Sequence, residues 1–274
     1  MAMRTSFRLG ACFAALVCGA ANAQTTPGSQ PSGGRVSNGP SFIEGIAGVD
    51  VPSSGMAIKS GLQGGSLTVG GASLSASANI RSVDFRTAYD TPLVLGFSIG
   101  RVLSDGSEVF GGFRFMRAAA KDFTLGTAVV SGTINAVPFA AGTPITGKLN
   151  DHQEFGIEAG YRRFFNPMWG GQPYAAGVLG LSRVNERKLS VSIPGGTVSD
   201  IRFSKSGYVP NGTLLIGYRA GDVASSSISL EGGVRYDFAP KADDADLATS
   251  GLGSINNSDG RVSFPARILG RIAF

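Results

Sequence analysis

Few side chains in this sequence combine the type and the spacing that catalysis or metal binding requires. His152 is the single histidine, and Gln153 and Glu154 follow it. A histidine acts as a general base only beside a nucleophile within hydrogen-bonding reach, and its sequence neighbours offer none. Cys12 and Cys18 both lie in a segment interpreted below as a cleaved leader. We therefore expect no thiol chemistry in the mature chain, no metal site and no cofactor.

Most of the other reactive side chains are acids and arginines that recur at every second position. Glu154, Glu158 and Arg162 show this spacing, and Phe155 and Ile157 alternate with them. Side chains at every second position share one face of a β-strand, so such a strand has one charged and one apolar face. The acids and arginines on these faces are Glu44, Glu108, Glu154, Glu158, Glu231, Asp237, Arg114, Arg162, Arg183, Arg219, Arg235, Arg267 and Arg271.

The elements that position these side chains are predicted to be long, two-faced strands. From Arg261 to Phe274, every even position is apolar or glycine, and the odd positions include Arg267 and Arg271. The segment 227–239 alternates in the same way. The other predicted strands are 42–51, 91–103, 107–119, 151–165, 173–186 and 209–219. Outside the leader, no stretch approaches the ~18 to 20 consecutive apolar residues of a membrane helix.

The segment 173–186 is the least regular, because apolar residues fall on both of its faces. We expect its outward side chains to be Tyr174, Ala176, Val178 and Val184, which places Leu179 and Leu181 inside. Aromatic residues gather near the strand ends, as in the interfacial girdles of membrane barrels. They are Tyr161, Phe165, Trp169, Tyr174 and Tyr218 at one end and Phe115, Tyr236 and Phe238 at the other.

The connections between the strands alternate in length. The segments 104–106, 166–172 and 220–226 are short, and 52–90, 120–150, 187–208 and 240–260 are long. Outer-membrane barrels have short periplasmic turns and longer external loops. Eleven residues at about 3.3 Å each, tilted by about 40°, rise about 28 Å, close to the apolar band of about 25 Å.

The sequence thus predicts an all-β fold, a transmembrane antiparallel up-and-down β-barrel of eight strands over residues 41–274. Four long external loops and two periplasmic termini follow from this arrangement. An extra hairpin within 76–90 would raise the strand number to ten.

The amino-terminal segment is predicted to be a secretory signal peptide. Arg4 and Arg8 precede a short apolar core, and Ala21 and Ala23 form a cleavage site before Gln24. Residues 1–23 would then be removed, and 24–40 would form a flexible periplasmic lead. The formal charge of +5 falls to +3 with the loss of the two arginines. This excess is small and scattered, so we expect no binding of nucleic acid.

The leader, the eight-strand pattern, the segment Phe155-Gly156-Ile157-Glu158-Ala159-Gly160-Tyr161-Arg162 and the terminal Phe274 resemble the OmpA/Opa-like family of small outer-membrane barrels. The resemblance covers residues 41–274, and no peptidoglycan-binding domain is expected after the barrel. It implies a bacterial outer-membrane location, with membrane lipid and lipopolysaccharide around the barrel. It also implies that the barrel-assembly machinery reads the last strand through Ile268, Ile272 and Phe274.

The interior of such a barrel is expected to be closed. An eight-strand barrel is only just wide enough for its own side chains, and charges in a narrow interior must be paired. The acids and arginines nearly balance, so we expect a self-neutralising plug that pairs Arg114 with Glu158, and Glu231 with Arg235 or Arg271. A selective pore would instead carry a ring of one sign.

Three functions are compatible with this sequence. The first is a non-enzymatic envelope protein whose loops serve structural support, adhesion or partner contact, with an unknown loop ligand. The second is a small passive channel. The third is lipid A modification, since some small outer-membrane barrels use a histidine and a serine near the outer leaflet. Glu154 stands where that serine would follow His152, so we expect no enzyme.

Overall fold

Eight antiparallel strands close into a barrel in which each strand pairs with its neighbours in sequence order and the last pairs with the first. The computed structural model describes residues 39–69, 72–134, 137–194, 196–221, 225–240, 255 and 259–274. The expected leader, with Ala21, Ala23 and Gln24, and residues 24–38 of the expected lead lie outside these ranges. The barrel strands are β1 (Ser41–Ser54), β6 (Leu93–Val102), β7 (Glu108–Ala118), β10 (His152–Phe164), β11 (Gly171–Val184), β14 (Gly207–Gly221), β15 (Ser226–Asp237) and β16 (Arg261–Ala273).

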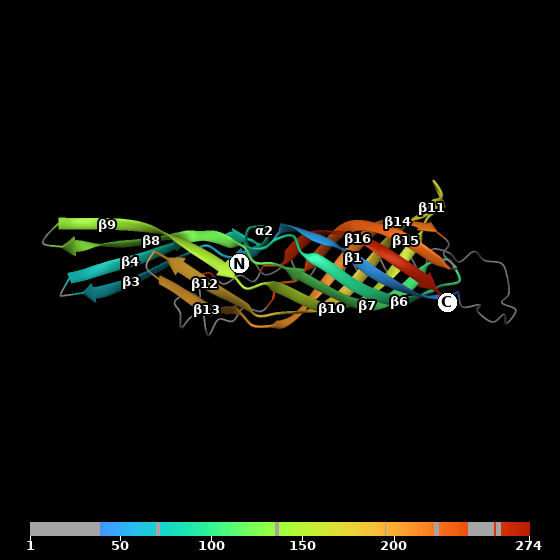
Figure 1. Cartoon of the computed structure of the whole chain (residues 1–274), viewed down its shortest axis with the longest axis horizontal. Coiled ribbons are helices and arrows are strands. Elements are labelled where there is room, and N and C mark those ends of the chain that lie inside the picture. Colours follow the sequence, from blue (N-terminus) through green and yellow to red (C-terminus); the bar gives the residue numbers. More distant parts are fainter. Residues whose placement is uncertain are drawn as a thin grey trace, which may run out of the picture.

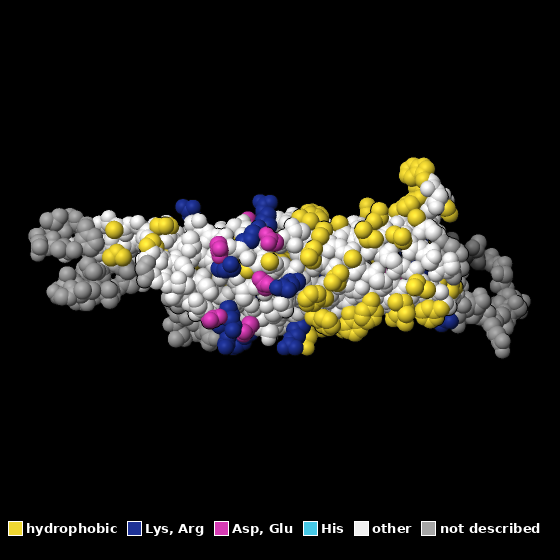
Figure 2. Space-filling model, viewed as in Figure 1, with side chains coloured by type: hydrophobic (Ala, Val, Ile, Leu, Met, Phe, Trp, Pro, Cys, Tyr) yellow, Lys and Arg dark blue, Asp and Glu magenta, His cyan; other side chains and the backbone are white. Residues whose placement is uncertain are grey.

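The predicted eight-strand barrel is confirmed, and every strand turns large apolar side chains outward. On β16, for example, Ile268 and Ile272 are exposed, whereas Arg267 and Arg271 are buried inside. We call the outward set the apolar belt, and Figure 2 shows it along the barrel wall. Its members include Ile43, Leu93, Leu95, Phe97, Ile99, Phe113, Phe155, Ile157, Leu179, Leu214, Ile216, Ile228, Leu230, Phe264, Ile268, Ile272 and Phe274.

The expected orientation of β11 is wrong. Tyr174, Val178 and Val184 are buried inside the barrel, and Leu179 and Leu181 are exposed on the belt. Ala176 is also buried inside. Because both faces of this strand are apolar, alternation alone does not fix its phase. The observed orientation of β11 is explained by the polar contacts that Tyr174 makes in the lumen.

Three of the four long connections, expected as loops, fold as β-hairpins. The strands β3 (Gly61–Val69), β4 (Ala72–Ile80), β8 (Asp122–Ile134), β9 (Val137–Leu149), β12 (Arg187–Ile193) and β13 (Gly196–Ser204) form one open sheet in the order β13-β12-β9-β8-β4-β3. This projecting sheet extends beyond one end of the barrel along the long axis of the molecule (Figure 1). No hairpin forms within 76–90, the segment considered as a route to ten strands: residues 76–80 are the end of β4, and the barrel has eight strands.

The mouth of the barrel at the sheet end is covered by a small cap. It consists of β2 (Met56–Ile58), β5 (Val83–Asp84) and the one-turn helix α2 (Phe85–Ala88). Phe85 and Tyr89 pack with Leu125, Leu149 and other buried side chains in one hydrophobic core, which joins the cap to the projecting sheet. Within the described ranges, no helix has the length and apolar character needed to cross a membrane.

Candidate functional site

The inward charges of the barrel form two groups along its axis. The group nearer the short turns, which we call the turn-side cluster, contains Glu44, Glu108, Glu231, Arg162, Arg219 and Arg271. Arg162 is its centre, since its Nη atoms lie 3.0 Å from Glu44 Oε1, 2.8 Å from Glu108 Oε2 and 3.1 Å from Glu231 Oε1. Three carboxylates face three guanidinium groups, so this cluster is neutral.

The same arginines lie against aromatic rings. The guanidinium carbon of Arg162 is 4.9 Å from the ring centre of Phe110 and 4.8 Å from that of Tyr174. The Tyr174 hydroxyl donates a hydrogen bond of 2.9 Å to Glu231 Oε1. A Cβ at Gly217 would overlap the Tyr174 ring, so the close approach of this ring requires glycine there. Charge pairing and ring stacking together fill this level of the lumen.

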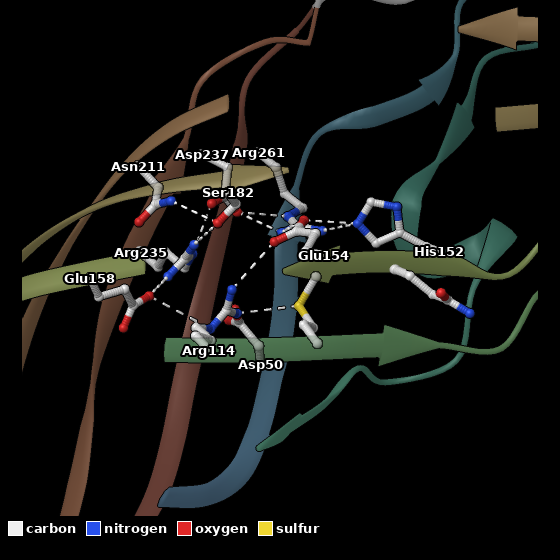
Figure 3. Close-up of polar contacts among 12 residues, drawn as sticks. Asp50, Arg114, His152, Glu154, Glu158, Ser182, Asn211, Arg235, Asp237 and Arg261 are labelled. Carbon is white, nitrogen blue, oxygen red and sulfur yellow. Dashed lines mark hydrogen bonds and ion pairs between the residues drawn. The ribbon is translucent and has the colours of Figure 1, made fainter. Parts of the chain in front are cut away.

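The second group, the sheet-side cluster, touches the cap, since the guanidinium carbon of Arg261 lies 4.6 Å from the ring centre of Phe85. Figure 3 shows the polar contacts among most of its members. Arg114 Nη2 lies 2.7 Å from Asp50 Oδ2, and Arg235 Nη1 lies 2.7 Å from Glu158 Oε1. Arg261 Nη2 lies 2.6 Å from both Glu154 Oε1 and Asp237 Oδ2. The members are Asp50, Glu154, Glu158, Asp237, Arg114, Arg235, Arg261 and Arg267. Four carboxylates balance four arginines, so this cluster is neutral as well.

His152 is buried at the top of the sheet-side cluster. Its Nε2 lies 2.8 Å from Glu154 Oε1, and its ring packs edge-on against Phe85 with centroids 5.0 Å apart. Tyr89 and Arg261 complete its surroundings. Among the described residues, no serine hydrogen-bonds to this imidazole. The site therefore holds the ring between a carboxylate and the cap.

Two further polar side chains are buried above the lumen: Tyr89, which follows α2, and Arg187, the first residue of β12. Burial raises the pKa of Tyr89 to about 12, against weaker opposite effects of Arg187 and Arg261. The Tyr89 hydroxyl and Arg187 Nε have no hydrogen-bond partner among the described residues. A cavity of about 30 Å³ lies beside Phe85, Arg187 and Arg261. That volume holds about two water molecules, so it is no conduit.

The structure brings most of the sequence-predicted charges together but changes several partners. Arg114 lies 3.8 Å from Glu158, as expected, although Asp50 is nearer. The expected partners of Glu231 are wrong, since it pairs with Arg162, while Arg235 pairs with Glu158 and Asp237, and Arg271 pairs with Glu108.

One predicted lumen residue lies outside, and two lumen residues were missed. Arg183 is exposed on the outward face of β11, because that strand has the opposite phase. Asp50 and Arg261 are buried in the sheet-side cluster. The sequence contained a signal for both: Asp50 lies an even number of positions from Glu44, and Arg261 an even number from Arg267, so each shares the inward face of its strand.

The lumen is filled rather than open. Arg162 and Arg219 are each only 1% exposed and Arg235 is fully buried, although an arginine lining a water-filled channel would be exposed. Within the described part of the chain, no three His, Cys, Asp or Glu side chains gather as a metal site would require. Fold and site together define a closed eight-strand β-barrel with a charge-neutral interior and a projecting sheet.

Comparisons with known proteins give matches among solved structures only. No protein-family model matches the chain. No curated protein matches its sequence. Among solved structures, the chain is similar to Neisserial surface protein A (NspA), with 15% identity and a TM-score of 0.36, over 85% of this chain and 97% of that one. A similarity at this level assigns no family.

Proposed function

We propose that this protein is a non-enzymatic barrel of the bacterial outer membrane that displays its projecting sheet for contact with a partner. The apolar belt carries this proposal. Each exposed Leu, Ile or Phe forgoes about 1.5–3 kcal/mol of burial, so a belt with members on every strand is costly in water and stable in lipid. A barrel satisfies all its backbone hydrogen bonds internally, as the lipid phase requires. The resemblance of the sequence to OmpA/Opa-like barrels supports the same location.

A charged collar marks one edge of the belt. Ion pairs there join Arg117 to Asp151 at 2.8 Å and Lys148 to Asp122 at 3.3 Å. Figure 2 shows these charges as a band between the belt and the projecting sheet. Such a band suits the polar head groups of a membrane surface, and in the outer leaflet these would belong to lipopolysaccharide. The projecting sheet then stands in the medium outside the cell, and both termini face the periplasm.

The projecting sheet offers a partner a surface of unusual composition. No charged residue occurs in the segments 60–80, 123–147 and 189–199, which form most of its three hairpins. An uncharged surface has few long-range electrostatic preferences, so shape and hydrogen bonding would select its partner. Such a surface supports adhesion or partner contact rather than the binding of a charged small molecule.

The filled lumen favours display over transport. Both clusters are neutral, and the cap covers the sheet end of the barrel. We therefore expect purified protein in a planar bilayer to give no stable single-channel steps. Well-defined steps from the unmodified chain would contradict the closed lumen and restore the passive channel.

Surface display can be tested with single cysteines, because the described part of the chain contains none. Ser131→Cys places a thiol in the β8–β9 hairpin, and Asn166→Cys places one in the short β10–β11 turn. A membrane-impermeant maleimide should label intact cells at position 131 and should label position 166 only after permeabilisation. The reverse pattern would invert the topology, and labelling of both positions on intact cells would refute the membrane location.

The last strand is the proposed assembly signal. Ile268, Ile272 and Phe274 all point outward and are exposed on the belt. An outward apolar row that ends on an aromatic residue is accessible to the barrel-assembly machinery before lipid covers it. Ile272→Asp should reduce the amount of barrel in the outer membrane, while Ile193→Asp in the projecting sheet, outside the belt, should leave that amount unchanged.

A further inference from the structure

The short turn between β10 and β11 exposes a cluster of apolar side chains at the end of the barrel opposite the projecting sheet. Trp169 is 90% exposed, Phe165 is 55% exposed and Met168 is 45% exposed. Figures 1 and 2 show the segment before β11 standing sideways off the barrel wall, with apolar side chains at its tip. The turn thus points away from the side wall of the barrel and not along the barrel axis.

The backbone of this turn holds the tryptophan in a strained position. Trp169 has a φ of 48° and Gly170 a φ of 77°, in the left-handed region that favours glycine and asparagine. Paired backbone hydrogen bonds of 2.9 and 3.1 Å between Met168 and Gly171 close the turn. Tyr218 Oη donates to Met168 O at 2.6 Å and lies 2.9 Å from Trp169 O. An exposed aromatic residue is thus retained where asparagine or glycine would fit without strain.

We infer that this turn is a membrane anchor, which inserts Trp169, Phe165 and Met168 into the interface of the leaflet on the short-turn side. The inference rests on the proposed membrane location. Tryptophan suits this interface because its ring is apolar and its indole N–H remains near water. The turn continues the apolar belt at Tyr161 and Phe165, so lipid already reaches its base.

A basic side chain lies close to the same turn on the same strand. Arg163 is exposed, and its Nη1 lies 2.7 Å from Asp105 Oδ2 in the neighbouring short turn. A cation at the rim of an apolar anchor lies at the depth of the lipid phosphates. The anchor would fix how deeply the barrel sits and would prevent it from sliding along its axis.

The anchor can be tested directly because Trp169 is the only tryptophan in the chain. The protein is inserted into phosphatidylcholine–phosphatidylglycerol vesicles, and insertion is verified by the different electrophoretic mobility of unheated and heated samples. We expect a blue-shifted emission and weak quenching by aqueous acrylamide. Phospholipids brominated near the head-group end of the acyl chain should quench more strongly than those brominated near the bilayer centre.

Each other outcome overturns the inference in a recognisable way. Water-like emission with full acrylamide quenching, in a barrel shown to be inserted, leaves the membrane location intact and removes the anchor. Protection from acrylamide that persists in detergent and rises with protein concentration assigns the turn to contact with a second copy of the chain. A barrel that does not enter the vesicles removes the membrane location and the anchor together.

A variant separates anchoring from turn stability. Trp169→Asn fits the left-handed backbone and removes the apolar ring. In detergent micelles its urea midpoint, followed by electrophoretic mobility, should equal or exceed that of the unmodified protein. In vesicles its midpoint should be lower, and Trp169→Phe should recover part of the loss. Equal shifts in micelles and vesicles would show that the ring matters only to the turn itself.

Discussion

Replacing Arg162 by methionine removes the cation at the centre of the turn-side cluster. Arg162 contacts Glu44, Glu108 and Glu231, so three carboxylates would be left with two arginines in a region closed to solvent. Removing one partner from a buried ion pair costs about 3–5 kcal/mol, because the remaining charge stays buried. Methionine keeps the volume of the side-chain stem, and most of the loss should therefore be electrostatic.

The neighbouring Arg163 provides a matched control. Its side chain is 44% exposed, and it pairs with Asp105, which is 45% exposed, on the outside of the same barrel end. Exposed pairs contribute about 0–1 kcal/mol, so Arg163→Met should be nearly neutral. Urea unfolding in micelles, followed through the fluorescence of Trp169, should separate the two variants by about 3 kcal/mol.

A second substitution tests whether charge is the cause. Adding Glu231→Gln to Arg162→Met restores neutrality and leaves an amide oxygen that can still accept the Tyr174 hydroxyl. The double variant should recover part of the lost stability. If Arg162→Met and Arg163→Met lose the same free energy, or the double variant recovers none, the argument from buried charge is refuted.

Three further predictions follow from the described contacts. Arg114→Ala removes the cation that lies 2.7 Å from Asp50. We expect either single-channel steps in planar bilayers or a loss of about 3–5 kcal/mol of unfolding free energy. Unchanged conductance together with unchanged stability would refute the closed lumen. Gly217→Ala should lower the unfolding free energy by about 1–3 kcal/mol, because the new Cβ overlaps the Tyr174 ring. The control Gly177→Ala should be nearly neutral in the same unfolding assay, because its Cβ meets nothing within 4 Å. Burial raises the pKa of Tyr89 to about 12, so the contribution of Tyr89 to the unfolding free energy should be constant below pH 10, where the ordinary tyrosine pKa lies. This contribution should fall by about 3 kcal/mol between pH 10 and 12, because the unfolded state loses its proton first. Tyr89→Phe should make the fall between pH 10 and 12 smaller by that amount, and an absorbance titration in which the substitution removes no tyrosine of high pKa would contradict the burial argument.

The barrel was predictable because its environment imposes a simple rule on each strand. On β15 and β16 one face is apolar and the other charged, so alternation identifies both strand and orientation. On β11 that rule gives no answer, since Tyr174 and Val178 are as apolar as Leu179 and Leu181. The inward direction of Tyr174 depends on Glu231, 57 residues away in sequence, and on Arg162 of the neighbouring strand β10.

The projecting sheet and the ion-pair partners were beyond the reach of alternation. In the middle of β8, residues 127–129 are all half-buried, so the two faces of the strand do not differ in burial there. Partner choice in the lumen depends on the stagger between strands, which sequence spacing does not give. Arg271 therefore meets Glu108 rather than Glu231. Alternation along each strand identifies the residues that point inward, but which acid pairs with which arginine depends on the three-dimensional arrangement of the closed barrel.

The lumen charges are distributed unevenly along the chain, and this matters at the seam where β1 meets β16. The first strand brings two carboxylates inward, Glu44 and Asp50, and the last brings three guanidinium groups, Arg261, Arg267 and Arg271. Before closure, the two free edges of the curled sheet therefore carry opposite charge on the face that becomes the interior. Coulomb attraction across a shrinking, low-dielectric gap draws those edges together, and the charges of both clusters balance only once they have met. The same residues that seal the finished barrel thus favour pairing of β1 with β16 over pairing of two like edges, β1 with β1 or β16 with β16, which would bring like charges together.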